Sequence, residues 1–159
     1  MSVANITQQY LSFTLGGEVF ALDISKVREV LDYTEPTKVP QTPEFMRGVI
    51  NLRGGVVPVV DLKLKFGMPR TERGINTCII ITEVALGDEH AIIGAMADSV
   101  REVFDLSPEQ IEPAPRIGTH LNTAFLKGMG KHNDNFILLL DIDKVFTEVE
   151  LTAVSAAGE

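Results

Sequence analysis

Several residue types on which enzymes and secreted proteins depend are scarce in this chain. Its 159 residues include one cysteine, three histidines and no tryptophan. A single cysteine excludes an internal disulfide. No apolar run is long enough to span a membrane, and no secretory signal stands at the N-terminus. The sequence therefore predicts a cytoplasmic protein.

Basic residues are also fewer than acidic ones. Fourteen Lys and Arg residues stand against 22 Asp and Glu residues, which gives a net charge of −8 at pH 7. General binding to nucleic acid or to an anionic membrane needs a basic face, so this balance argues against both partners. An apolar fraction of 45% is ordinary for a globular protein, and the length suits one domain with a real core.

Motifs for catalysis and for metal or cofactor binding are missing. His90, His120 and His132 are scattered, without the spacing of metal ligands. Cys78 lies in an apolar run, where a small buried hydrophobe is the expected role. The chain holds no nucleophile elbow, phosphate-binding loop or dinucleotide fingerprint. We therefore expect no enzymatic activity, no cofactor and no metal.

Four aspartates could be mistaken for acid–base groups. They stand at matched positions where a strand is expected to give way to a helix, and N-capping explains such placement: Asp23, Asp61, Asp98 and Asp141.

The most informative stretch runs from Phe45 to Phe66. Thr42 suits the N-cap and Pro43 the first position of a short helix, which Gly48 should end. The elements expected in order are a helix over 44–47, a strand over 49–53, a Gly-Gly hairpin turn at 54–55, a strand over 56–60 and a helix over 62–66. Together they form a compact half-barrel.

This stretch occurs twice. Phe125–Gly128 repeats Phe45–Gly48 after 80 residues, and ILLLDIDKVF repeats VPVVDLKLKF at the same offset. VREVFD repeats VREVLD after 73 residues. The chain is therefore a tandem duplication, and we predict a mainly β fold of two pseudo-symmetric small barrels with short helices. The expected boundaries are 8–70 and 75–150, followed by a flexible tail at 152–159.

The remaining elements follow from local patterns. Strands are expected over 10–15, 18–22, 77–84, 91–97 and 147–151. The two VREV segments have apolar residues at helical spacing and are expected to be short helices, the second one capped by Asp98-Ser99. Ser107–Gln110 reads as a capping box, and 112–121 is the longest irregular stretch and the expected mobile loop.

Packing leaves part of the surface unexplained. Arg53 stands beside a turn that needs no arginine, and Ile24 or Val27 could line a groove. A solvated charge and ordinary core residues are the simpler explanations of these positions. A catalytically empty, acidic, duplicated β domain nevertheless favours an adaptor, which recruits other proteins through apolar patches and sheet edges.

Three stretches resemble the CheW-type chemotaxis coupling proteins: FTLGGEVFALDISKVREV, TPEFMRGVINLRGGVVPVVDL and SPEQIEPAP. The resemblance covers roughly Gln9 to Glu148, and NLRG followed by VPVVDL is specific to the family. The same domain occurs in the regulatory part of the kinase CheA and in CheV proteins. Here it stands alone, so a plain CheW-type protein is expected.

The resemblance implies two SH3-like five-stranded barrels with a hydrophobic layer between them. It also implies a non-enzymatic scaffold that joins chemoreceptor cytoplasmic tips to a CheA-type histidine kinase in membrane-associated arrays. A free monomer is expected. The resemblance assigns no kinase-binding residues, and it places receptor contact on Leu11, Ile24, Val27, Glu29, Gly48, Arg53 and Val100.

Two alternatives stay open. One is a coupling domain of a chemosensory pathway that controls something other than motility. The other belongs to a different class: a small β-barrel enzyme or ligand-binding domain with its site between the halves.

Overall fold

The computed structural model describes residues 7–113 and 123–157, and it is mainly β. The strands are β1 (Gln8–Leu15), β2 (Glu18–Asp23), β3 (Val27–Asp32), β4 (Met46–Leu52), β5 (Gly55–Asp61), β6 (Cys78–Leu86), β7 (Glu89–Ala97), β8 (Ser99–Leu106), β9 (Ile111–Glu112), β10 (Leu126–His132) and β11 (Asn135–Leu140). The α-helices are α1 (Leu62–Lys65), α2 (Ile142–Val145) and α3 (Glu148–Ala157). Short 3₁₀ turns cover Ile24–Lys26, Pro108–Gln110 and Thr123–Phe125.

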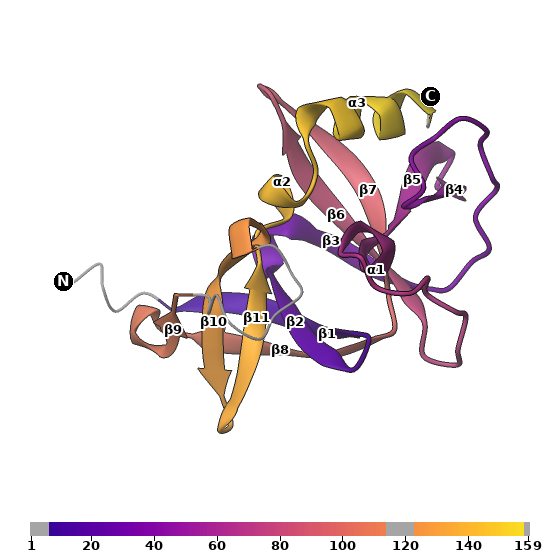
Figure 1. The fold of residues 1–159 in the computed structure, drawn as a ribbon. Coiled ribbons are helices and arrows are strands. Elements are labelled where there is room, and N and C mark those ends of the chain that lie inside the picture. Colours follow the sequence, from indigo (N-terminus) through magenta and orange to yellow (C-terminus); the bar gives the residue numbers. More distant parts are fainter. Residues whose placement is uncertain (1–6, 114–122, 158–159) are drawn as a thin grey trace.

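The strands form two curled sheets, as Figure 1 shows. Sheet A has the strand order β8-β1-β2-β11-β10-β9, in which β9 is only two residues long. Sheet B has the order β3-β6-β7-β5-β4. Sheet A forms barrel A and sheet B forms barrel B. These are the two small barrels expected from the duplication, and they have the SH3-like form that the resemblance implies.

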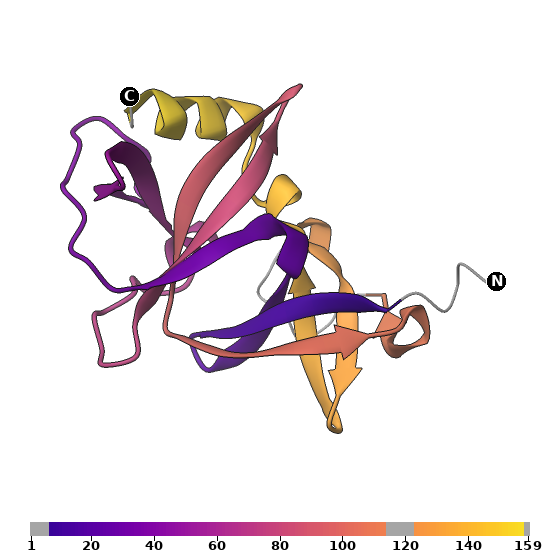
Figure 2. The same ribbon diagram turned by 180° about the vertical axis from the view of Figure 1, so that it is seen from behind.

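The two halves of the chain exchange strands. The hairpin β1–β2 comes from the first repeat, yet it completes sheet A with β8, β10 and β11 of the second repeat. The hairpin β6–β7 of the second repeat likewise completes sheet B with β3, β4 and β5 of the first. The chain visibly crosses between the sheets after β2 and again after β7 (Figure 2). Sheet membership therefore does not follow the predicted boundaries 8–70 and 75–150.

The pairing repeats with the duplication. Parallel pairing joins β2 to β11 in sheet A and β7 to β5 in sheet B. Thr37 forms an isolated bridge with Val49, and Glu112 of β9 pairs with Met129 at the equivalent place. The exchange is therefore reciprocal, and each barrel is built in the same way from both repeats.

Three apolar clusters hold the fold together. The largest lies between the sheets and includes two reciprocal ring pairs, Phe45–Phe146 at 5.3 Å and Phe66–Phe125 at 5.6 Å between centroids. Since Phe125 and Phe146 repeat Phe45 and Phe66, these pairs mark the pseudo-symmetry axis. The interior of barrel A holds Tyr10, Ala21, Phe104, Leu106, Ile137 and Leu139, and that of barrel B holds Ile50, Val57, Val59, Ile79, Ile81 and Met96.

The hairpin strands expected from alternation are confirmed in both repeats. The helix predicted over 44–47 is wrong: Glu44 and Phe45 form a turn in which Met46 N donates to Pro43 O, and Met46 already belongs to β4. The hairpin turn predicted at Gly54-Gly55 lies one residue earlier in the structure. Leu52 pairs with Gly55, so the two turn residues are Arg53 and Gly54.

The two VREV segments are strands, in contrast to the predicted helices. Only Ile24–Lys26 is helical before the first of them, and Asp23 caps this turn by accepting a hydrogen bond from Ser25 N. β-Branched valines favour strands. In β3 burial alternates at period two, with Val27, Glu29 and Leu31 half-buried and Val30 exposed, so the apolar residues fit the helical spacing although the segment is a strand. Asp98 precedes a strand, so its predicted capping role is wrong.

The C-terminal predictions also change. The strand expected over 147–151 is wrong, because Thr147 and Glu150 form a capping pair that begins helix α3. This helix includes residues 152–157 of the predicted tail, and Leu151 and Val154 are buried against the central cluster. The Ser107–Gln110 capping box is confirmed, whereas most of the expected mobile loop, 114–121, lies outside the described residues.

Candidate interaction surface

Strands β3 and β8 carry the repeated VREV sequences, and each pairs with a neighbour on one side only. Within the described residues β3 pairs with β6, and β8 pairs with β1. Both strands begin directly after a crossing between the sheets. Four predicted contact residues gather here and pack against the layer between the sheets: Leu11, Ile24, Val27 and Val100. Of these, Leu11 is buried and the other three are half-buried.

A groove of about 480 Å³ runs between the end of β3 and the start of β8. Val30 is 42% exposed at its rim, and Ile75 in the connection before β6 is fully exposed. Val100 lines the same groove from β8, together with Asp32, Asn76, Thr77, Cys78 and Ser99. Exposed apolar side chains beside polar ones are typical of a surface that binds another protein. Sequence reasoning identified Val100 and missed Val30 and Ile75.

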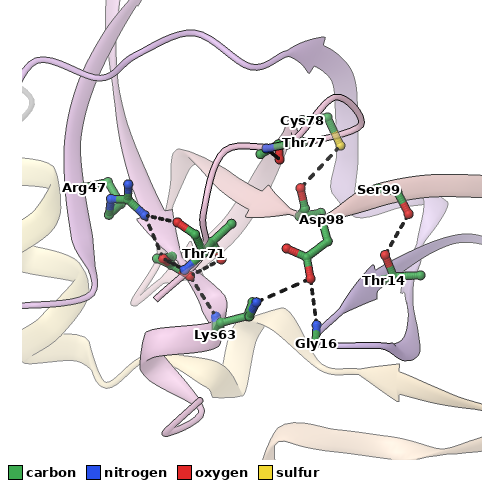
Figure 3. A network of polar contacts seen from close by, with 12 residues as sticks. Thr14, Gly16, Arg47, Lys63, Thr71, Thr77, Cys78, Asp98 and Ser99 are labelled. Carbon is green, nitrogen blue, oxygen red and sulfur yellow. Dashed lines mark hydrogen bonds and ion pairs between the residues drawn. The ribbon is translucent and has the colours of Figure 1, made fainter. Parts of the chain in front are cut away.

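A network of polar contacts fixes the start of β8, as Figure 3 shows. Asp98 Oδ2 accepts a hydrogen bond from Gly16 N at 2.8 Å and lies 3.5 Å from Lys63 Nζ. The hydroxyls of Thr14 and Ser99 lie 2.7 Å apart. These contacts join β8 to the β1–β2 hairpin and to α1. They hold the crossing between the sheets in place beside the groove.

Arg53 is part of a two-residue hairpin turn. Its φ is 51° and that of Gly54 is 84°, which matches a type I′ turn. A left-handed conformation is unusual for arginine, so the turn does not by itself favour this residue. The Arg53 guanidinium instead reaches β3, where its Nη2 lies 2.9 Å from Glu29 Oε1 and its Nη1 bonds Glu29 Oε2.

This ion pair connects two predicted contact residues across sheet B. The hydrogen bonds from Arg53 hold the pKa of Glu29 below its usual value, partly offset by the small desolvation of the carboxyl. The Arg53 side chain is 73% exposed. An exposed pair of this kind adds little stability, so it remains available to exchange partners.

Gly48 has a structural role that its neighbours explain. It lies at a bulge where the pairing of β4 with β5 shifts, and its φ is 140°. A Cβ at this position would collide with the carbonyl oxygen of Thr37. Thr37 can therefore bridge to Val49 only because residue 48 has no side chain. The packing accounts for this glycine without a partner.

The described histidine, cysteine and acidic side chains form no metal site, and Cys78 is not an activated thiol. In residues 7–113 and 123–157, no three His, Cys, Asp or Glu side chains gather as a metal site would require. Burial, with smaller contributions from Asp32 and Asp98, raises the pKa of Cys78 to about 11, so its thiol stays protonated at neutral pH. His90 and His132 lie beside carboxylates of different strands, Glu83 and Glu102, and His120 falls outside the described residues.

None of the helices in the described part of the chain is long and apolar enough to cross a membrane.

Comparison with known proteins agrees with this fold. Residues 9–150 match the CheW-like domain family. The chain belongs to the CheW family. It is 37% identical to the chemotaxis protein CheW of Klebsiella aerogenes over 94% of this chain and 87% of that one. It is 31% identical to a probable chemotaxis protein CheW of Rhizobium etli, over 92% of each chain.

A solved CheW structure shows the same architecture. The scaffolding protein TtCheW from Thermoanaerobacter tengcongensis aligns with a TM-score of 0.79 and 36% identity, over 92% of both chains. The two curled sheets therefore form a CheW fold of two SH3-like barrels.

Proposed function

We propose that this chain is a non-enzymatic scaffold that couples chemoreceptor cytoplasmic tips to a CheA-type histidine kinase. Membership of a family of chemotaxis proteins supports this role, and a relative of the same fold is described as a scaffolding protein. The protein would act in the cytoplasm and be recruited to receptor arrays at the membrane. A monomer is the expected free form.

The observation that carries the proposal is the groove between β3 and β8. It combines exposed Val30 and Ile75 with the half-buried Val100. Glu29, beside Val30 on β3, pairs with Arg53 of the turn between β4 and β5. An amphipathic helix from a receptor tip fits such a surface, because apolar anchors enter the groove while charged residues meet the rim. We also propose that the receptor contacts the residues predicted from the sequence, which are Leu11, Ile24, Val27, Glu29, Gly48, Arg53 and Val100.

Coupling of this kind needs no chemical step. A receptor whose conformation changes the free energy of one interface changes the occupancy or geometry of the other. Coupling free energies of about 1–3 kcal/mol alter an equilibrium by roughly 5- to 150-fold. This range is sufficient for a signal to reach the kinase through a protein without an active site.

An enzyme or ligand-binding site between the halves has less support. The space between the sheets is filled by apolar side chains, among them Phe13, Phe20 and Leu62, which are fully buried. A coupling domain for a pathway other than motility would use the same surface, so the identity of the kinase distinguishes that alternative.

The first test is a calorimetric titration of the protein with the regulatory domain of a CheA-type kinase from the same organism. Binding in the micromolar range or tighter, unchanged by added nucleotide, supports the scaffold. The absence of heat and of a complex with every such kinase of the cell would contradict it.

The second test addresses the groove. Val100→Asp should weaken binding of a receptor tip fragment by at least about tenfold, because a carboxylate would be buried against an apolar partner. Val103→Asp, at an exposed position on the same strand β8, is the matched control. Equal effects of the two variants would remove the groove from the proposal.

A further inference from the structure

A second concave site lies on barrel B, apart from the groove. It has a volume of about 520 Å³ and is bounded by the connection from β3 to β4, by Leu64 of α1 and by Arg70. None of its lining residues lines the groove beside β3 and β8. The proposed function does not use this site.

The site is basic on an acidic protein. Lys38, Arg47 and Arg70 line it, with Glu44 as the one acidic residue among the lining residues, whereas the chain carries a net charge of −8. Arg47 is already engaged, because its Nη1 lies 2.9 Å from the buried carboxylate of Asp61. Lys38 and Arg70 are exposed and form no ion pair within the described residues.

Apart from Gln41 and Thr42, the rest of the lining is apolar. Val39, Pro40 and Pro43 come from the connection, and Met46 and Leu64 come from β4 and α1. A free phosphate or a metal ion would not use this apolar area. A partner that combines negative charge with aliphatic side chains matches the whole lining.

The shape of the connection is set before any partner arrives. Two prolines fix the backbone at residues 40 and 43, and Thr42 Oγ1 donates a hydrogen bond to Val39 O at 3.0 Å. Between the two prolines, Gln41 adopts a left-handed conformation with φ of 59°. A site ordered in advance loses little conformational entropy when it binds, so a short segment can be held there.

Nucleic acid fits this site less well than a peptide. Single strands stack on aromatic side chains, and the lining residues include none. The acidic charge of the whole protein would also repel a long polyanion. A short acidic peptide avoids both problems.

From these observations we infer that the pocket around Lys38 and Arg70 is a docking site for a short acidic peptide segment with aliphatic side chains, supplied by a partner protein. The two free cations pair with its carboxylates, and Val39 and Leu64 contact its apolar residues. This inference does not depend on the proposed coupling role.

The experiment uses the full chain and one defined probe. The probe is an N-acetylated, C-amidated hexapeptide with the sequence Glu-Leu-Glu-Glu-Leu-Glu, titrated while backbone amide shifts are recorded. The amides of the non-proline residues among 38–44 and of Leu64 should shift, with an affinity that falls as salt is added.

Charge-reversal variants distinguish peptide binding at this site from general electrostatic attraction to the protein. Lys38→Glu combined with Arg70→Glu should weaken binding by at least about tenfold, because attraction at two positions becomes repulsion. Arg101→Glu combined with Lys131→Glu changes the net charge equally at exposed positions of barrel A and should leave binding unchanged. A peptide with Gln in place of Glu should bind more weakly by a similar factor.

Three results would overturn the inference: no shifts at residues 38–44 up to millimolar peptide, equal losses in the two double variants, or equal binding of the Gln peptide. Thermal melting of each variant confirms that the fold is retained, and both pairs lie on exposed positions where substitutions cost little stability.

Discussion

The blocks Phe45–Phe66 and Phe125–Phe146 occupy equivalent places in the two barrels, but their aspartates have different surroundings. In each block the aspartate backbone N–H donates to a phenylalanine carbonyl, Asp61 to Phe45 and Asp141 to Phe125. Beyond this shared bond the two residues differ. The Asp61 side chain is fully buried, whereas that of Asp141 is 18% exposed and lies 4.0 Å from Lys144.

The difference follows from what the chain does next. After the first block, the chain passes through the connection that contains Thr71, whose N and Oγ1 both donate to the Asp61 carboxylate. Arg47 donates to the same carboxylate and also to Thr71 O. After the second block the chain continues into α3 instead. A duplicated residue therefore acquired a second function, holding the connection between the repeats.

Another contact shows the same principle with the charges reversed. Lys63 in α1 lies near Asp98 at the crossing from β7 to β8. Asp143, 80 residues after Lys63, lies in α2 and pairs with Lys26 at the crossing from β2 to β3, at 2.7 Å. Helix α1 supplies the basic residue of the ion pair at one crossing, and α2 supplies the acidic residue of the ion pair at the other. Duplication thus preserved the position of a contact while its chemistry changed.

The largest effect should come from removing the buried carboxylate. Asp61→Ala leaves Arg47 and Thr71 without their shared partner, and removing one member of a buried ion pair typically costs about 3–5 kcal/mol in the free energy of unfolding. Asp141→Ala is the matched variant in the second block and should cost less than about 1 kcal/mol. Chemical denaturation measures both. Similar losses would show that the two blocks use their aspartates equally.

The bulge glycines should come next. Gly48→Ala should lower the free energy of unfolding by about 2–3 kcal/mol, because the new methyl collides with Thr37 O in a backbone conformation that favours glycine. Gly128→Ala meets Glu112 O at the equivalent place and should also destabilise.

Gly55→Ala is the control for these variants, since the nearest atom to its Cβ would be Leu52 O at 3.4 Å. It should change stability by less than about 0.5 kcal/mol. A tolerated Gly48→Ala, with Thr37 still bridged to Val49, would remove the close approach as the reason for this glycine.

The Lys26–Asp143 ion pair should make stability depend on pH in the acid range. Burial tends to raise the pKa of Asp143, but hydrogen bonds from Ala85 N and Lys26 outweigh it and hold this pKa below the ordinary value. A carboxyl whose pKa is lower in the folded state than in the unfolded state stabilises the fold at pH values above its unfolded-state pKa. That stabilisation is lost as the pH falls through the folded-state pKa, which lies below about 4.

Asp143→Asn should therefore flatten the dependence of unfolding free energy on pH in that range. Denaturation at a series of pH values between 3 and 7 checks this, with Lys144→Ala as a neighbouring control in α2. An unchanged slope in Asp143→Asn would contradict a stabilising role for the charge.

The smallest effect on stability should come from the exposed pair on β3. Arg53→His, or Arg53→Ala, should leave the free energy of unfolding almost unchanged, because the ion pair with Glu29 is exposed to solvent. Val27→Met should likewise leave the fold intact. Under the proposed function, both should weaken receptor coupling. A collapsed melting transition in either variant would instead make that residue structural.

Local patterns in the sequence were enough for much of the fold. Alternation and Gly-Gly turns located the hairpins, and the repeated VREV and VPVVD motifs revealed the duplication. The VREV strands were missed because Val27, Val30 and Leu31 fit a helical period, whereas in the strand Val30 lies on the exposed face, opposite Val27 and Leu31. The turn was misplaced because arginine rarely adopts the left-handed conformation that Arg53 has.

Other features depend on contacts between distant parts of the chain. The pairing of Phe20 with Leu138 has no local signal, so the exchange of strands could not be predicted from either repeat alone. The groove was only partly predicted for the same reason. Val100 was found through the resemblance, whereas Val30 and Ile75 become neighbours only when the connection before β6 folds against β3 and β8.

The exchange of strands also affects how the protein is made. When the first repeat leaves the ribosome, β1 and β2 have no edge strands to complete their barrel, because β8 and β11 have not been synthesised. Barrel B is equally incomplete until β6 and β7 emerge. Neither barrel can close during the first half of translation, and non-local pairing of this kind folds slowly. The nascent first repeat therefore has unpaired strand edges, which are prone to aggregation, until the second repeat arrives.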